Sequence, residues 1–276
     1  GETKTISTVD DLEGAKIGVQ LGTTGDIYSS DYEGDEAGTT VERYNKMADA
    51  IQALKQDKID CVIVDEQPAI AVTKDSGDLK ILEEEFVSED YAICIAKGNE
   101  QLKEKINEAL GALKEDGTIA DIISNYIGEE AGKHPYETPA GTSYDNGTLV
   151  AATNATFPPY EYYENETVTG IDIDIITAIG DRLGMKVEIS DMEFDAIINS
   201  VNSGKADVGI AGLTVTEDRL KSIDFSDAYT TSKQVIIVKG DGAGNQLSLS
   251  EKFKNNFIKE SRWKYIAKGL ENTLII

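Results

Sequence analysis

The stretch Ile51–Asp65, IQALKQDKIDCVIVD, decides the fold that the sequence predicts. Its first part places Ile51 and Leu54 on one face of a helix, and the apolar run from Cys61 to Val64 is typical of a buried strand. A second stretch, INSVNSGKADVGIAG at 198–212, repeats this order of helix, Asp and strand. The repetition indicates an α/β fold made of two lobes built on similar units.

The same alternation extends outward along the first half of the chain. A strand through Ile17, Gly18 and Val19 precedes the Gly-rich turn LGTTG, so the region up to Asp65 is predicted to be a βαβ unit. We then expect a strand in EDYAICIAKG (89–98), an amphipathic helix over 99–116 with Leu102, Ile106, Leu110 and Leu113 on one stripe, and a shorter helix from Ile119 to Tyr126 that ends at Gly128.

From Glu129 to Gly147 the periodicity stops. This stretch contains Pro135, Pro139 and several Gly, Ser and Thr residues, the composition of an exposed, flexible linker. His134 lies in it, and we expect this side chain to be solvated and without function. Strands and helices resume after Gly147, in TLVAATN, GIDIDIITAIGDRLG and KVEISDM, so a boundary is predicted here.

Composition excludes several classes of function. The chain has 276 residues and a formal charge of −25, spread along its length, which disfavours nucleic acid and anionic lipid as partners. Cys61, Cys94 and His134 are too few for a zinc cluster or a disulfide framework, and no metal or cofactor is expected. Both cysteines lie in apolar runs, so we expect buried free thiols, although oxidation of an adjacent-strand pair outside the cytoplasm stays open.

The C-terminal segment 253–276 differs from the rest. It carries basic residues beside Trp263 and Tyr265 and ends in Leu274–Ile276, so it is either the approach to a membrane helix or a frayed amphipathic helix. We expect no signal peptide before Gly1 and no apolar run that spans a bilayer.

Four motifs resemble one family. TNATFPPYEYY, GIDIDIITAIGDRL, the region from MEFDAIINS to LTVTEDRLKSIDFSDAY, and GVQLGTTGD are similar to the polar amino-acid-binding proteins of bacterial ABC importers, which have the type II periplasmic-binding-protein fold. The C-terminal segment resembles the start of the partner permease, which favours the membrane-approach interpretation. The resemblance implies two Rossmann-like α/β lobes joined by a hinge, no enzymatic activity, an amino acid ligand, and a permease and its ATPase subunit as partners. It also implies a location on the extracytoplasmic face of the bacterial plasma membrane, with tethering through the fused permease.

The order of the motifs departs from that family. The GVQLGTTGD half precedes the TNATFPPYEYY half, which a circular permutation bridged by the linker explains. The predicted parts are 1–88 as the family's second lobe, 89–93 as the only covalent hinge, 94–128 as C-terminal helices of its first lobe, 129–147 as the linker, 148–240 as its first lobe, and 241–276 as the connection to the permease.

A free amino acid brings an ammonium and a carboxylate out of water when lobes close on it, so each charge needs a partner already in place. Arg219 offers a fork for the carboxylate, helped by the backbone N–H of Thr24, and Asp65 would face the ammonium together with the Gly212 carbonyl and Thr214 hydroxyl. The resemblance assigns ligand contacts to Asn154, Phe157, Phe194, Gly212, Thr214, Arg219, Thr23, Thr24 and Asp65. Gln20 is also predicted to bind the ligand, but like Tyr160 and Glu193 it is a weaker candidate that the motifs do not fix.

Ligand specificity is only partly defined. Asn154 occupies a position where related binders often have Asp, and its amide suits a polar amino acid, while arginine or lysine stays open. An acidic ligand is disfavoured because the matched motifs offer no cation besides Arg219. The same fold also serves dehydratases and sensor modules of kinases or channels, so those classes are kept as alternatives to a transport protein.

Overall fold

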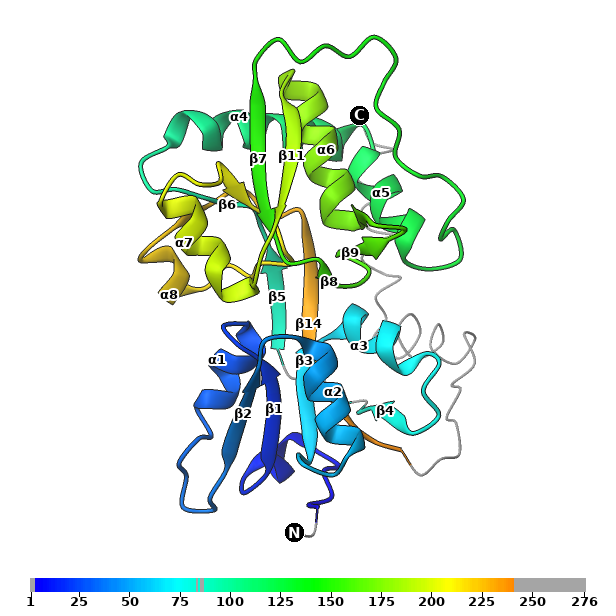
Figure 1. Cartoon of the computed structure of the whole chain (residues 1–276), viewed down its shortest axis with the longest axis vertical. Helices are drawn as coiled ribbons and strands as arrows, with labels where there is room; N and C mark the ends of the chain where they lie inside the picture. The colour runs from blue at the N-terminus through cyan, green and yellow to red at the C-terminus, as the bar shows by residue number, and fades with distance from the viewer. Residues whose placement is uncertain (1–2, 83, 85–86, 241–276) are drawn as a thin grey trace, which may run out of the picture.

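The computed structural model describes residues 3–82, 84 and 87–240. They form two α/β lobes stacked along the long axis of the molecule (Figure 1). We call the part built on strands β1–β4 and the end of β14 the N-terminal lobe, and the part built on β6, β7 and β11–β13 the central lobe. The predicted α/β class with two lobes is confirmed.

The N-terminal lobe has a central sheet in the order β2-β1-β3-β14-β4. β1 pairs in parallel with β2 and β3, while β14 runs antiparallel to β3 and β4. Helix α2 buries Met47, Ile51 and Leu54 against this sheet, as its periodicity predicts. The elements are η1 (Val9–Leu12), β1 (Lys16–Gln20), α1 (Thr24–Ser30), β2 (Thr40–Tyr44), α2 (Met47–Lys55), β3 (Cys61–Asp65), α3 (Glu66–Thr73) and β4 (Leu79–Ile81).

The central lobe has a sheet in the order β11-β7-β12-β6-β13 and a small three-stranded sheet, β10-β9-β8. β7 pairs in parallel with β11 and β12, and α6 covers the sheet with an almost completely buried run of isoleucines. The elements are β6 (Cys94–Ile95), α4 (Glu100–Glu115), α5 (Thr118–Tyr126), β7 (Thr148–Thr153), β8 (Thr156–Phe157), β9 (Glu161–Glu164), β10 (Thr167–Thr169), α6 (Ile171–Leu183), β11 (Lys186–Asp191), η2 (Phe194–Ala196), α7 (Ile197–Asn202), β12 (Val208–Gly209), α8 (Glu217–Leu220) and β13 (Asp224–Phe225).

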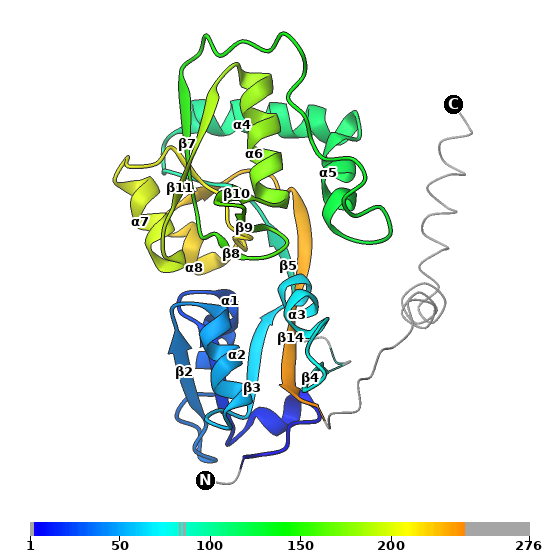
Figure 2. The same cartoon turned by 45° about the vertical axis from the view of Figure 1, so that its right-hand side comes forward.

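Two strands, not one, connect the lobes. β5 (Val87–Tyr91) and β14 (Thr230–Lys239) run side by side between them (Figures 1 and 2). Thr230–Gln234 of β14 pair with β5, and the later residues pair with β3 and β4. The sequence-based prediction of a single hinge, with the whole of 148–240 in one lobe, is therefore wrong at β14. The apolar run VIIVK is the part of β14 that has crossed into the sheet of the N-terminal lobe, and its position in the chain does not reveal that it pairs with β3 and β4.

The segment 129–147 has no helix or strand and is mostly exposed, but it is anchored at several points. The hydroxyls of Tyr136 and Tyr144 donate to Asp181 of α6 at 2.9 and 2.8 Å. Asn146 donates to the Leu183 carbonyl at 2.7 Å. His134 is half-buried and lies 3.3 Å from the Ser124 hydroxyl, so it is less solvated than the sequence suggests. These contacts hold the segment against the central lobe.

Cys61 and Cys94 are both free and buried. One lies on β3 of the N-terminal lobe and the other on β6 of the central lobe, so they are not a bridged pair. Burial raises the pKa of each thiol to about 12. The structure thus confirms the expectation of free, buried cysteines.

The membrane-approach segment 253–276 and the predicted connection from 241 onward lie outside the described residues. Within the described part, none of the helices combines the length and the apolar character that crossing a bilayer requires.

Candidate functional site

The predicted site residues lie where strands of the two sheets end. Gln20 and Asp65 are the last residues of β1 and β3 in the N-terminal lobe. Asn154 directly follows β7, and Gly212 and Thr214 follow β12, in the central lobe. Carboxyl ends of neighbouring parallel strands meet at one edge of a sheet, which is where α/β proteins bind their ligands.

The structure brings every predicted ligand-binding residue to one cleft between the lobes. The lining comprises Gln20, Thr23, Thr24, Asp65, Asn154, Phe157, Phe194, Ala211, Gly212, Thr214 and Arg219. The side chains leave a cavity of only about 10 Å³, so the lobes are closed on each other. An amino acid could reach this cleft only after the lobes separate.

Arg219 lies on α8, whose first turn is capped by the Thr216 hydroxyl. The side chain is only 7% exposed and donates to the carbonyl oxygens of Thr214 at 2.7 Å and Gly22 at 2.9 Å. Its guanidinium carbon lies 5.6 Å from the centre of the Phe194 ring. Burial lowers the pKa of Arg219, since the carbonyl dipoles replace bulk water only in part. The bond to Gly22 spans the two lobes.

The turn opposite Arg219 begins helix α1. The Thr23 hydroxyl accepts from the Asp26 amide at 3.3 Å, and the Gly22 amide donates to the Asp26 carboxylate at 2.9 Å. Gly22 has φ of +77°, a conformation that favours glycine. These bonds fix the turn, with Thr24 only 3% exposed beside the cleft.

Asp65 is 5% exposed and accepts a hydrogen bond from the Tyr91 hydroxyl. Burial, and next the negative charge of Glu89, raise the pKa of Asp65 to about 8. Glu89 is also buried, and its Oε2 accepts from the Thr214 hydroxyl and from Gln234 Nε2, both at 3.0 Å. The site therefore holds two carboxyl groups in a region of low dielectric.

Sequence reasoning missed Glu89, Tyr91 and Gln234. All three lie on the crossing strands β5 and β14, which the motifs do not include. A signal was present for two of them: Gln234 directly precedes the apolar run VIIV, and Glu89 lies two residues before the apolar run that begins at Tyr91. Polar residues in such runs are buried only when they have partners.

Position 212 favours glycine over any residue with a side chain. Its φ is +52°, and a Cβ there would lie 3.1 Å from Phe157 Cε1 and 3.2 Å from the Tyr91 ring. Its amide donates to Asp172 at 2.6 Å, and the Tyr229 hydroxyl donates to the same carboxylate oxygen at 2.8 Å. Burial raises the pKa of Asp172 to about 6, an effect that these hydrogen bonds oppose. Asp172 thus orients the Gly212 backbone toward the cleft.

Gln20 and Asn154 join the lobes on the other side of the cleft. Gln20 Nε2 donates to Asn154 Oδ1 at 3.0 Å, while the Asn154 amide nitrogen donates to the Met192 carbonyl at 2.8 Å. The Thr156 hydroxyl also donates to Asn154 Oδ1, at 2.8 Å. In the closed structure Asn154 is engaged by protein groups, and its predicted role toward a ligand side chain stays a prediction.

The weaker candidates Tyr160 and Glu193 do not line this cleft. Glu193 is exposed. Tyr160 is 2% exposed and separates the cleft from a second cavity: its ring lies 5.9 Å from that of Phe157 and 5.1 Å from that of Tyr91.

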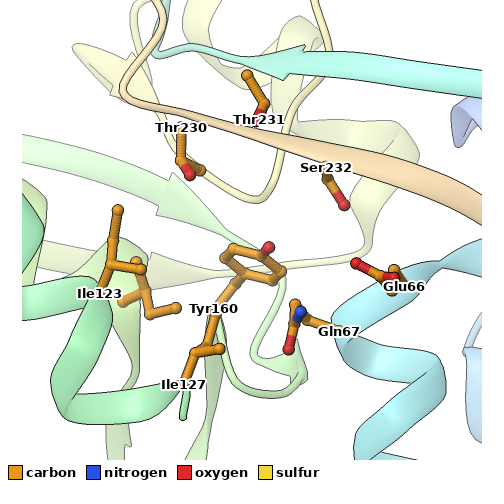
Figure 3. Close-up of a pocket in the computed structure, with 9 residues that line it drawn as sticks. Glu66, Gln67, Ile123, Ile127, Tyr160, Thr230, Thr231 and Ser232 are labelled. Atoms are coloured by element: carbon orange, nitrogen blue, oxygen red, sulfur yellow. The ribbon is translucent and has the colours of Figure 1, made fainter. Parts of the chain in front are cut away.

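The second cavity measures about 160 Å³ and lies between α3, α5 and β14 (Figure 3). Its lining combines isoleucines with hydroxyl, amide and carboxyl groups: Glu66, Gln67, Ile123, Ile127, Tyr160, Ile171, Thr230, Thr231 and Ser232. Of the predicted ligand-binding residues, only the weaker candidate Tyr160 lines it. In the described region, no group of three or more His, Cys, Asp or Glu side chains is arranged to hold a metal ion.

The chain belongs to the bacterial extracellular solute-binding proteins, family 3, whose profile matches residues 34–129 and 149–268. The resemblance to solute-binding proteins and the fold that it implies are thereby confirmed. Members of this family bind solutes and are not classed as enzymes.

Individual relatives match only part of the chain. The arginine-binding extracellular protein ArtP of Bacillus subtilis is 32% identical over 102 residues, which are 37% of this chain and 40% of that protein. The L-cystine-binding protein TcyJ of Escherichia coli is 31% identical over 134 residues, 48% of this chain and 49% of that protein. The chain therefore spans less than half the length of these curated relatives.

Among solved structures, an ancestral arginine-binding protein bound to arginine is 54% identical over 29% of this chain and 36% of its own, with a TM-score of 0.29. Domain 1 of the arginine-binding protein TmArgBP is 33% identical over 42% of this chain and 94% of its own, with a TM-score of 0.30.

Proposed function

We propose that this chain is the substrate-binding domain of an ABC-type amino acid importer, and that it binds a free polar L-amino acid between its lobes and delivers it to a permease. It performs no chemistry on the amino acid. The relatives' names, which include arginine and cystine as ligands, support an amino acid as the solute.

The observation that carries this proposal is the position of opposite charges on opposite lobes. Arg219 of the central lobe and Asp65 of the N-terminal lobe are both buried at the same cleft. Among the described residues, the Arg219 side chain donates only to backbone carbonyls, which carry no full charge, and a bidentate carboxylate would match its planar fork better. An amino acid supplies a carboxylate for Arg219 and an ammonium for Asp65, so one zwitterion would hold the lobes together.

Basic amino acids are the second candidate, and a charge count favours them. Asp65 and Glu89 supply two buried carboxyl groups at the site, against one buried guanidinium from Arg219. A ligand of net charge +1, such as arginine or lysine, would balance these groups when both carboxyls are ionised. The three motif-based contacts near the ligand side chain, Asn154, Phe157 and Phe194, are compatible with either class.

A thermal-shift screen of the chain against the free amino acids tests the proposal. A ligand of the folded protein stabilises by RT ln(1 + [L]/Kd), about 2.7 kcal/mol at a hundredfold excess over Kd. We expect one polar or basic amino acid to raise Tm by several degrees, with D-enantiomers as controls. A flat response to every L-amino acid would contradict the proposed function.

The permuted order is part of the proposal. Ile6, near the start of the described chain, and Val238, near its end, lie in the same buried cluster of the N-terminal lobe. A direct connection between these regions would restore the family order. A variant that joins Gly240 to Lys4 through a short linker and is opened within 129–147 should bind the same ligand; loss of binding in a folded variant would count against permutation.

Tethering of this domain to the extracytoplasmic face of the membrane, through the segment after Gly240, completes the proposal. It rests on the sequence of 253–276 alone. Expression of the natural gene followed by membrane fractionation would test it, and release of the domain by a salt wash would contradict it.

A further inference from the structure

We propose that Glu89 and Gln234, one on each crossing strand, are positioning residues that set the direction in which two ligand-binding hydroxyl groups point their protons. In this arrangement Thr214 accepts a hydrogen bond from the ligand ammonium, and Thr24 donates one to the ligand carboxylate. The inference rests on the proposed function and adds to it two residues that do not touch the ligand.

The register of the crossing strands brings Glu89 and Gln234 together. Glu89 of β5 pairs with Ser232 of β14, and Gln234 follows two positions later, so Glu89 and Gln234 are diagonal neighbours on one face of the strand pair. Glu89 is 4% exposed and Gln234 is fully buried. Gln234 Nε2 donates to Glu89 Oε2 at 3.0 Å, which joins the two strands through their side chains.

Each member of this pair contacts one threonine of the cleft. The Thr214 hydroxyl of the central lobe donates to Glu89 Oε2 at 3.0 Å, and Gln234 Nε2 donates to Thr24 Oγ1 of the N-terminal lobe at 3.2 Å. Both threonines line the cleft, whereas Glu89 and Gln234 are not among the lining residues. The pair therefore reaches a ligand in the cleft only through the two threonine hydroxyls.

Glu89 acts as a hydrogen-bond acceptor in this network. Arg219 attracts its carboxyl group electrostatically, and Tyr28 of α1 hydrogen-bonds with it in addition to Thr214 and Gln234. A carboxyl group among several donors and beside a guanidinium favours its ionised form, which can only accept.

The direction of each further bond follows from Glu89. Because a carboxylate only accepts, the Gln234 atom 3.0 Å from it is the amide nitrogen, and Thr214 must turn its proton toward Glu89. The amide nitrogen of Gln234 only donates, so Thr24 meets it with its oxygen and keeps its own proton for another acceptor.

These directions match the two ends of a free amino acid. A hydroxyl group has one proton and two lone pairs, so Thr214 offers only lone pairs to the cleft, which suit an ammonium. Thr24 has a proton to offer, which suits a carboxylate. The predicted contacts are the same: the Thr214 hydroxyl for the ammonium and the Thr24 backbone N–H for the carboxylate. Glu89 and Gln234 thus give the site a polarity that fixes the orientation of the zwitterion.

Titration calorimetry of the full chain with L-glutamine and with L-arginine tests the inference through a double-mutant cycle. Gln234→Met removes the donor and keeps an unbranched side chain of similar size, and Thr24→Val removes the hydroxyl. We expect Gln234→Met to weaken binding by about tenfold in the parent and by less than about threefold in the Thr24→Val background, because the hydroxyl that Gln234 orients is then absent. A loss of the same size in both backgrounds would overturn the inference.

A second set of variants separates hydrogen bonding at Glu89 from its charge. Glu89→Gln keeps an oxygen that accepts from both Thr214 and Gln234, whereas Glu89→Met removes the acceptor. We expect Glu89→Gln to stay within about threefold of the parent and Glu89→Met to lose at least about tenfold, with most of that loss absent in a Thr214→Val background. If Glu89→Gln loses as much affinity as Glu89→Met, the charge of Glu89 acts on the ligand and the inference is wrong.

Gln67→Met is the matched control for Gln234→Met. Gln67 lines the second cavity, so the same chemical change there should leave affinity within about twofold of the parent. A tenfold loss in Gln67→Met would count against the inference, because the effect at Gln234 would then not be specific. Thermal unfolding verifies that each variant folds, and if one set of variants does not fold, the other set decides alone. Failure of every free L-amino acid to bind the parent would overturn both the inference and the proposed function.

Discussion

The two cavities beside Tyr160 differ in size and in charge. The larger, about 160 Å³, is walled on one side by isoleucines of α5 and α6. The cleft on the other side leaves about 10 Å³, yet it collects Arg219 and Asp65 from opposite lobes. If the proposed site is the ligand site, empty volume in a closed protein does not identify it. Buried charged side chains that lack a full countercharge identify a ligand site better, because a protein tolerates them only where another group balances their charge.

The comparison of the cleft with the larger cavity is tested most strongly by a variant without the Arg219 side chain. Arg219→Ala should weaken amino acid binding by about 3 to 5 kcal/mol, more than a hundredfold, since the ligand carboxylate would be buried without a partner. Arg219→Lys should recover part of the loss, because it restores charge but not the bidentate fork. Titration calorimetry measures both, and an Arg219→Ala variant within tenfold of the parent would contradict the site.

A smaller effect is expected at Gly212. Gly212→Ala places a methyl group 3.1 Å from Phe157 Cε1 in a backbone with φ of +52°, so we expect about 1–3 kcal/mol lower stability and roughly tenfold weaker binding. Gly204→Ala is the control, because Gly204 has φ of +72° but no atom within 4 Å of the added Cβ. Equal loss of affinity in both variants would show that the contact with Phe157 is unimportant.

The smallest effect is expected in the larger cavity. Ser232→Ala and Ile123→Ala alter its polar and apolar walls and should change amino acid affinity by less than about threefold. Stability can fall by 1–3 kcal/mol for Ile123→Ala without a change in binding, so affinity and Tm are measured on the same samples. A tenfold loss of affinity in Ser232→Ala would mean that the two cavities are not independent.

Periodicity alone predicted much of the fold. The helices around Ile51 and Leu110 and the strand at Cys61 follow from local apolar patterns, because burial on one face requires that spacing. β14 was misplaced because its pairing with β3 joins residues about 170 positions apart, and no local pattern encodes such a contact.

For the site, resemblance to a family supplied the residues of the motifs, and the structure gathers them at one cleft. It could not supply Glu89 or Gln234, since these depend on where the crossing strands lie relative to Thr214. The hydrogen bonds that anchor 129–147 to Asp181 also could not be predicted from the sequence. A Pro- and Gly-rich composition indicates that periodic structure is absent, but it does not indicate that contacts are absent.

The pairing of β5 with β14 sets the mechanics of opening. Val87 to Tyr91 of β5 pair with Thr230 to Gln234 of β14 in an antiparallel ladder. Sliding one strand along the other would break several hydrogen bonds at once, whereas bending or twisting the ribbon strains each of them slightly. The lobes should therefore rotate as rigid bodies by bending or twisting of the β5–β14 ribbon. The rotation should have a preferred axis, with little sliding of one strand along the other. Glu89 lies on this ribbon, so its hydrogen bonds to Thr214 and Gln234 act where a small change of angle moves the rims of the cleft most.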